Sequence, residues 1–236
     1  MAVVSELGEN WTTTASGQTV TATPAVNDLI VVVHGMSGWA SGDTSVMTDN
    51  QGGTYDQIGG NPLSNGGGTG GALWISIRTS LISLAVSTIF SVTNVGASGG
   101  GLTVLKVTGM TRTGVLAALK NAGESTQTEN PPVIAFASAT LAGNPIILAV
   151  IGEDNPAGVT PPTGFTETTD TGWSTPTTGV EVCFDSDGNT LSSYAWSGGA
   201  LTDHNEVGVE LDTSILSSLL ARPAQINQAV HRAGSF

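Results

Sequence analysis

Residues 27–33 (NDLIVVV) and 144–151 (NPIILAVI) are the two segments that decide the fold. Each begins with a turn-forming pair, Asn-Asp or Asn-Pro, and continues as an unbroken apolar run rich in β-branched residues. Short apolar runs bounded by turn signals are typical of β-strands that are buried on both faces. Other strand-like runs, separated by Gly-rich or polar turns, recur every ten to fifteen residues around both segments. This spacing predicts an all-β protein.

The same order of strand signals recurs in the two halves of the chain. In the first half, the predicted strands are 19–23, 29–33, 54–58, 73–77, 88–92 and 102–107. In the second half, they are 146–151, 163–166, 179–184, 193–197 and 207–211, and the offset between the halves falls from about 117 to about 104 residues. We interpret the chain as an internal duplication of low identity in which mainly the loops differ in length. Glycine clusters at 66–71 and 99–101 are predicted to be mobile loops.

Two arrangements agree with this duplication: two separate domains, or two halves that form the sheets of one sandwich. An isolated five-strand half would expose a long apolar face, which favours the single sandwich. We therefore predict a jelly-roll-like antiparallel β-sandwich over residues 19–213, with half one at about 19–110 and half two at about 130–213. Residues 1–18 are then an N-terminal segment, and residues 214–236 a polar C-terminal arm.

The formal net charge of −13 is distributed unevenly. Residues 1–120 hold six acids and four bases, a balance of −2, whereas residues 121–221 hold thirteen acids and no Lys or Arg. The last fifteen residues hold two arginines and no acid. Nucleic acid is disfavoured as a partner, because phosphate binding needs clustered bases. No apolar run reaches the roughly 18 to 20 residues that span a bilayer, and no secretory signal is visible, so we expect synthesis in a cytoplasm and no membrane partner.

The sequence offers no workable catalytic set. His34 ends a buried strand before a glycine turn, but the pattern G-x-S-x-G fails because Trp39 stands where the last glycine belongs. Asp203 and His204 are adjacent and would face opposite sides of a strand, so we interpret them as a solvated turn. The single cysteine, Cys183, lies between alternating apolar residues and is predicted to be structural. We predict no enzymatic activity and no cofactor.

Asp185, Asp187 and Asn189 are the best candidates for metal ligands. Their carboxylate and amide oxygens alternate along the chain, as a hard cation such as calcium prefers. The segment lacks the bidentate glutamate and the full spacing of a calcium loop. The same residues also suit an ordinary hairpin turn, so both interpretations stay open.

Tryptophans supply the candidates for glycan binding. Trp39 and Trp173 lie in loops rich in Gly, Ser and Thr, where an exposed indole could stack on a sugar. Trp74 and Trp196 lie in predicted strands, so we expect them in the core.

The segments 27–33 (NDLIVVV), 48–55 (TDNQGGTY) and 73–74 (LW) are similar to a pattern found in phage-encoded β-sandwich proteins. In those proteins an apolar strand, a hairpin like "DNxGNTY" and an "LW" strand follow one another. Their later segments are matched by 162–167 (PTGFTE) and 193–197 (SYAWS). The resemblance spans about residues 20–212 and implies a virion component with no shared catalytic residues.

The resemblance, the acidic sandwich and the lack of a catalytic set predict a structural protein of a bacteriophage virion that is made in the host cytoplasm. The leading hypothesis is a capsid decoration (cement) protein that binds the outside of the shell through its terminal segments. Its expected partners are the major capsid protein and further copies of itself, for example in a trimer, with Arg222, Arg232 and Phe236 as binding residues. The alternative is a carbohydrate-binding tail or fibre module that uses Trp39 or Trp173.

Overall fold

The computed structural model describes residues 1–13, 17–38, 43–59, 71–95, 99–127, 131–153, 158–174, 177–198 and 204–214. For residues 125–127, 153, 173–174 and 177–178 it describes the backbone alone. Across these ranges the protein is all-β with antiparallel sheets, as predicted, and has one short helix, α1 (Gly114–Ala118). None of the helices in the described ranges is long and apolar enough to span a bilayer.

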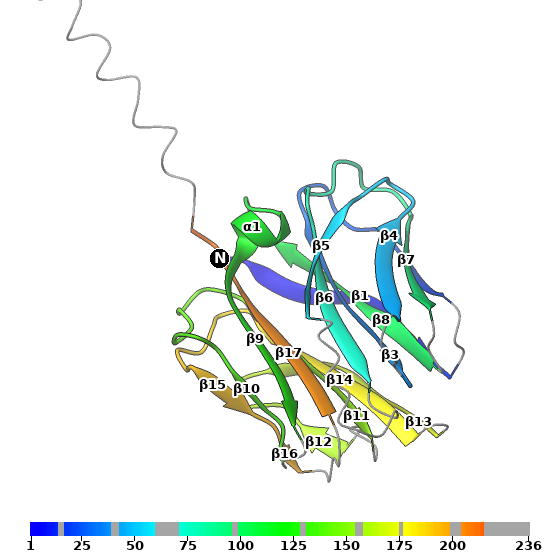
Figure 1. Ribbon diagram of the computed structural model, residues 1–236. Coiled ribbons are helices and arrows are strands. Elements are labelled where there is room, and N and C mark those ends of the chain that lie inside the picture. The colour runs from blue at the N-terminus through cyan, green and yellow to red at the C-terminus, as the bar shows by residue number, and fades with distance from the viewer. Residues whose placement is uncertain are drawn as a thin grey trace, which may run out of the picture.

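The first half of the chain forms a five-stranded and a three-stranded sheet (Figure 1). The five-stranded sheet has the order β1-β8-β3-β6-β5, with strands β1 (Val3–Thr12), β8 (Gly99–Thr108), β3 (Leu29–Ser37), β6 (Ala72–Arg78) and β5 (Tyr55–Gly59). The three-stranded sheet has the order β2-β7-β4, with strands β2 (Gln18–Ala22), β7 (Thr88–Val95) and β4 (Thr44–Asp49).

The second half forms another five-stranded sheet and two small ribbons. The sheet has the order β9-β17-β11-β14-β13, with strands β9 (Leu119–Gln127), β17 (His204–Leu211), β11 (Ile146–Glu153), β14 (Thr177–Asp185) and β13 (Thr166–Ser174). The ribbons are β10-β15 (Val133–Ala135 with Ser193–Ala195) and β12-β16 (Val159–Thr160 with Ser197–Gly198). We call these two ribbons together the cover.

The two segments from which the fold prediction started hold equivalent places. β3 is the central strand of the first five-stranded sheet, and β11 is the central strand of the second. Residues 29–33 and 146–151 have no solvent exposure, as expected for apolar runs between two partner strands with both faces covered. Each central strand pairs on one side with the last strand of its half, β8 or β17.

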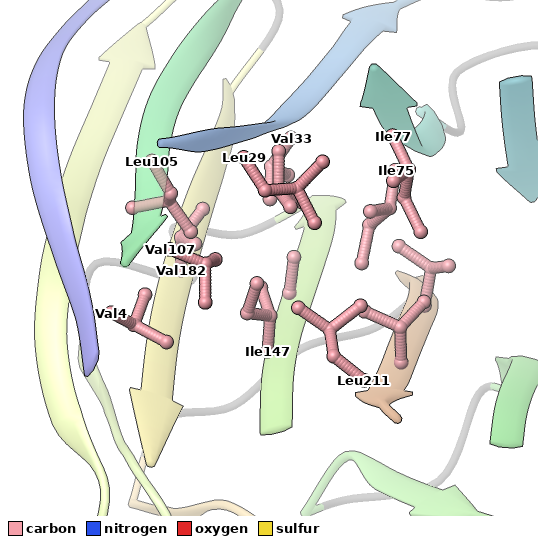
Figure 2. Close-up of a cluster of buried hydrophobic side chains, with 14 of the residues drawn as sticks. Val4, Leu29, Val33, Ile75, Ile77, Leu105, Val107, Ile147, Val182 and Leu211 are labelled. Carbon is pink, nitrogen blue, oxygen red and sulfur yellow. The ribbon is translucent and has the colours of Figure 1, made fainter. Parts of the chain in front are cut away.

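A shared apolar core lies between the inner faces of the two five-stranded sheets (Figure 2). Side chains alternate along a strand, so every second residue of each central strand points into this core. Leu29, Val31 and Val33 of β3 do so in the first sheet, and Ile147 and Ile151 of β11 do so in the second. Burial of such side chains stabilises each by roughly 1.5–3 kcal/mol, so the two halves support each other.

The outer face of each five-stranded sheet is covered as well. The remaining residues of β3, such as Ile30 and Val32, pack against Phe90 and Val92 of the three-stranded sheet. In the second half, the outward residues of β11 pack under the cover in a cluster that also contains Ile134, Cys183, Tyr194 and Trp196. The described chain therefore has four β-layers: the three-stranded sheet, the two five-stranded sheets and the cover.

Polar contacts also join the two halves. The Val4 amide of β1 donates to Ser186 Oγ at 3.0 Å, just beyond the end of β14. The hydroxyls of Thr103 in β8 and Thr169 in β13 are 2.7 Å apart and buried between the sheets. These contacts place β1 and β13, an edge strand of each sheet, along the same side of the shared core.

The prediction of a mobile loop at 99–101 is wrong. These glycines form the buried start of β8 and pair with β1 on one side and β3 on the other. A Cβ at Gly101 would lie 2.1 Å from the carbonyl oxygen of Asn10, so the close approach of β1 requires a residue without a side chain. Of the other cluster, Gly71 is buried against Ile151, and 66–70 fall outside the described residues.

Candidate functional site

A buried polar network around His34 joins the first five-stranded sheet to the three-stranded sheet. His34 Nδ1 lies 2.7 Å from Ser45 Oγ in β4, and its Nε2 lies 2.7 Å from Ser76 Oγ in β6. Ser45 donates to Asn94 Oδ1 in β7 at 2.7 Å. The imidazole also stacks on the indole of Trp74, with ring centroids 5.6 Å apart. The network thus links four strands through side chains.

Burial lowers the pKa of His34 to about 3, so the imidazole is neutral at physiological pH. Because the Ser45 proton goes to Asn94, His34 Nδ1 donates to Ser45, and Ser76 donates to Nε2. A serine bonded to a histidine is also the arrangement of an activated nucleophile. Here both ring nitrogens contact serines, and His34 and Ser76 are fully buried. The pair is closed to solvent, and the contact of His34 with Ser45 links its sheet to the three-stranded sheet.

Two glutamates on the outer face of the second five-stranded sheet attach the cover. Glu181 in β14 accepts a hydrogen bond on Oε1 from the Trp196 indole at 3.0 Å. Glu206 in β17 accepts one on Oε1 from the Val133 amide at 2.8 Å. Each carboxyl therefore uses one oxygen to hold one strand region of the cover over the sheet.

The second oxygens of these glutamates are buried without partners. Glu181 and Glu206 lie in one row on either side of Val150, and His204 Nε2 is 3.0 Å from Glu206 Oε1. In the described part of the chain, Glu181 Oε2, Glu206 Oε2 and His204 Nδ1 have no hydrogen-bond partner. Among the described residues, no group of three or more His, Cys, Asp or Glu is placed to hold a metal ion.

Burial of His204 corrects the prediction that this residue lies in a solvated turn. It is 2% exposed and belongs to β17, whereas Asp203 falls outside the described residues. Cys183 is buried in β14 as predicted. The signal that could have revealed the row is the alternation Glu206-Val-Gly-Val-Glu210, which places both acids on the face opposite to two core valines.

The candidate calcium ligands form a turn that is closed by its own hydrogen bonds. Asp185 Oδ1 accepts from the Asp187 amide at 2.9 Å, and its Oδ2 accepts from Asn189 Nδ2 at 2.9 Å. Gly188 supplies a positive φ of 69°, which a turn of this kind needs. Asn189 thus directs its amide nitrogen at Asp185, whereas a cation would require its oxygen. A turn that is closed by its own hydrogen bonds accounts for all of these contacts. It is not the hairpin that the sequence suggested, because β14 pairs with β11 and β13, whereas the next strand, β15, pairs with β10.

The structure does not test the residues expected to bind partners. Trp39 and the arm residues 222–236 lie outside the described residues, and Trp173 is in β13 with only its backbone described. Trp74 and Trp196 are 7% and 1% exposed, which confirms their expected place in the core. Glycan stacking and docking through the arm stay predictions.

Comparison with known proteins gives no family: no family model matches the chain, and no curated protein does. The resemblance to virion proteins consequently rests on the sequence motifs alone.

Proposed function

We propose that this chain is a structural protein of a bacteriophage virion, and specifically a capsid decoration protein that stays bound to the outside of the shell. The motif pattern at 27–33, 48–55 and 162–167 supports the virion assignment. The positions of the titratable polar side chains support a structural role. His34 is sealed between two sheets, and Glu181 attaches the cover, so both support layers rather than surround a substrate.

We further propose that the two halves arose by duplication and that each is a jelly-roll-like unit. Their five-stranded sheets have the same strand order and face each other across one core. Moving one half against the other would open that core, so we expect the body to be rigid. Rigidity suits a protein that binds and stays bound, because little conformational freedom is lost on docking.

In this proposal, the C-terminal arm makes the contact with the shell. β1 is paired with β8 over most of its length, so the N-terminal segment belongs to the body. Ser214 is the last described residue, and its carbonyl oxygen accepts a hydrogen bond from Arg112 Nε at 2.9 Å. Arg112 also lies 3.4 Å from the Asp212 carboxylate, which fixes the base of the arm. Beyond it, two arginines and no acid suit an acidic or strand-accepting partner.

Mass spectrometry of particles purified on a density gradient, from the virus that encodes the chain, tests the virion assignment. We expect peptides of the chain in the intact-particle fraction in a fixed ratio to the major capsid protein. Recovery in the soluble fraction alone would contradict the assignment.

Add-back to particles that lack the chain tests the arm. Full-length protein is expected to co-sediment with such particles, whereas a chain that ends at Ser214 stays in the supernatant. The double variant Arg222→Gln and Arg232→Gln keeps the length of the arm and separates charge from chain length. Equal co-sedimentation of the truncated and full-length chains would rule out the arm as the docking element.

A further inference from the structure

Glu181 is a buried acid at the junction between the second five-stranded sheet and the cover. Its side chain points to the outer face of the sheet, as does the side chain of Val150, its register partner in β11. It has no solvent exposure; Oε1 accepts the Trp196 indole, and Oε2 has no partner within the described residues. Trp196 lies between β15 and β16, so this hydrogen bond joins both ribbons of the cover to the sheet.

The charged groups that face Glu181 are almost all acids. β13 contributes Glu167 and Asp170, the latter directly opposite Glu181 in the register. β17 contributes Glu206 and His204 on the far side of β11. The described residues of the cover carry no ionisable group except the Tyr194 hydroxyl, and the chain has no Lys or Arg between residues 121 and 221. No Lys or Arg of this stretch is therefore available to balance a charge on Glu181.

An ionised Glu181 carboxylate would be buried next to other acids, with Oε1 hydrogen-bonded and Oε2 without a partner among the described residues. Burial raises the pKa of Glu181, and the carboxylates of Glu167 and Asp170 raise it further. The hydrogen bond from Trp196 opposes them, and the resulting pKa is about 8. The folded protein therefore keeps this carboxyl protonated at neutral pH. If the cover lifts, water reaches the carboxyl, and its pKa returns towards the ordinary value of 4.5.

We propose that Glu181 and Trp196 form a pH-sensitive latch that closes the cover over the second five-stranded sheet in acid and loosens it as the pH rises. The sign follows from proton linkage. Between pH 4.5 and pH 8 the closed state holds a proton that the open state releases. The population of the open state therefore rises about tenfold per pH unit in this window and levels off above it.

Cys183 provides a probe of the open state. It is the only cysteine of the chain, and it is buried under the cover on the same face of β14 as Glu181. Burial under the cover is the main cause that raises the pKa of its thiol, so we expect it to react only after the cover opens. Its labelling rate in the folded protein thus measures the fraction of open molecules.

The experiment is labelling of the full chain with a disulfide reagent from pH 5.5 to pH 7.5, relative to a short cysteine peptide. The peptide should react about tenfold faster per pH unit, because its thiolate fraction rises. Wild-type protein should accelerate by about a hundredfold per pH unit, because opening adds a second factor of ten. Glu181→Gln keeps an acceptor for Trp196 and cannot titrate, so it should follow the slope of the peptide. Glu124→Gln, an exposed glutamate of β9, should keep the slope of the wild type.

The wild-type slope alone decides the proposal if Glu181→Gln fails to fold: a tenfold rise per pH unit would overturn it. Equal, steep slopes in wild type and Glu181→Gln would also overturn it. Amide hydrogen exchange in β3, measured on the same samples, separates local from global opening. It should be much slower than labelling; equal rates would show that the whole molecule opens and that the cover is not a separate latch.

Discussion

Arg78 and Asp49 form an ion pair inside the first half, with 2.9 Å between Nε and Oδ2 and side chains that are 6% and 0% exposed. Burial alone would raise the pKa of the Asp49 carboxyl. Hydrogen bonds from the Gly53 amide, the Tyr55 hydroxyl and Arg78 outweigh burial and hold the pKa below its ordinary value. The carboxylate therefore stays charged at neutral pH, and water cannot replace its partner.

We expect Arg78→Met to destabilise the protein by about 3–5 kcal/mol, because it leaves the buried Asp49 charge without its partner. Arg112→Met is the matched control, since Arg112 lies 3.4 Å from Asp212 near the surface, and it should cost at most about 1 kcal/mol. Urea unfolding at pH 7 measures both values. Similar losses in the two variants would contradict the assignment of a special role to the buried pair.

Burial of single residues could be predicted from the sequence only where neighbours are apolar. Cys183, Trp74 and Trp196 lie in or beside apolar strands, and their burial follows from that pattern. Glu181 and His204 could not be placed in this way, because charged side chains are normally assigned to the surface. Their burial depends on the cover, whose strands come from segments as distant as 133–135 and 197–198.

The start of β8 shows how strand packing can require glycine. Gly101 pairs with Trp11 of β1 and Gly35 of β3, and any Cβ there would collide with the backbone at Asn10. We expect Gly101→Ala to push β1 away and to cost about 1–3 kcal/mol. Gly158→Ala is the control, because a Cβ at Gly158 meets nothing within 4 Å. Thermal unfolding compares the two; an unaffected Gly101→Ala protein would refute the need for close approach.

The edge strands β1, β4 and β9 were not predicted from the sequence, whereas the edge strands β2 and β5 were. The pattern of β1 is mixed, and β9 (Leu119–Gln127) reads LKNAGESTQ, with a glycine and few apolar residues. Their partners β8 and β17 were predicted, because central strands are apolar. An edge strand gains much of its stability from backbone hydrogen bonds to its neighbour, which a hydrophobic pattern does not record.

At the scale of the whole molecule, the shared core predicts that both halves unfold together. Ile147 of β11 is fully buried between the two five-stranded sheets. Ile147→Ala should cost about 2–5 kcal/mol, and the loss should reach both halves. Amide hydrogen exchange in increasing urea measures the free energy of opening separately in β7 and in β14. We expect Ile147→Ala to lower both free energies equally. Leu116→Ala, at a residue that is 99% exposed, should shift neither. Destabilisation confined to β14 would mean that the halves are independent domains.

Two buried groups make opposite contributions to the pH dependence of stability. The pKa of His34 is about 3 in the folded state against an ordinary 6.5, so stability is lost as the pH falls from 6.5 towards 3. The pKa of Glu181 is about 8 against 4.5, so stability is lost as the pH rises from 4.5 to 8. Each slope is about 1.4 kcal/mol per pH unit, and between pH 4.5 and 6.5 the two cancel.

We therefore expect the free energy of unfolding, measured in urea from pH 4 to pH 9, to be highest between about pH 4.5 and 6.5. His34→Gln removes the loss on the acid side and should move the maximum to lower pH. Glu181→Gln removes the loss on the alkaline side and should move it to higher pH. Displacement of the stability maximum in opposite directions by these two uncharged substitutions would show that His34 and Glu181 determine the pH profile. A wild-type stability that climbs steadily from pH 5 to pH 8 would show that other groups dominate.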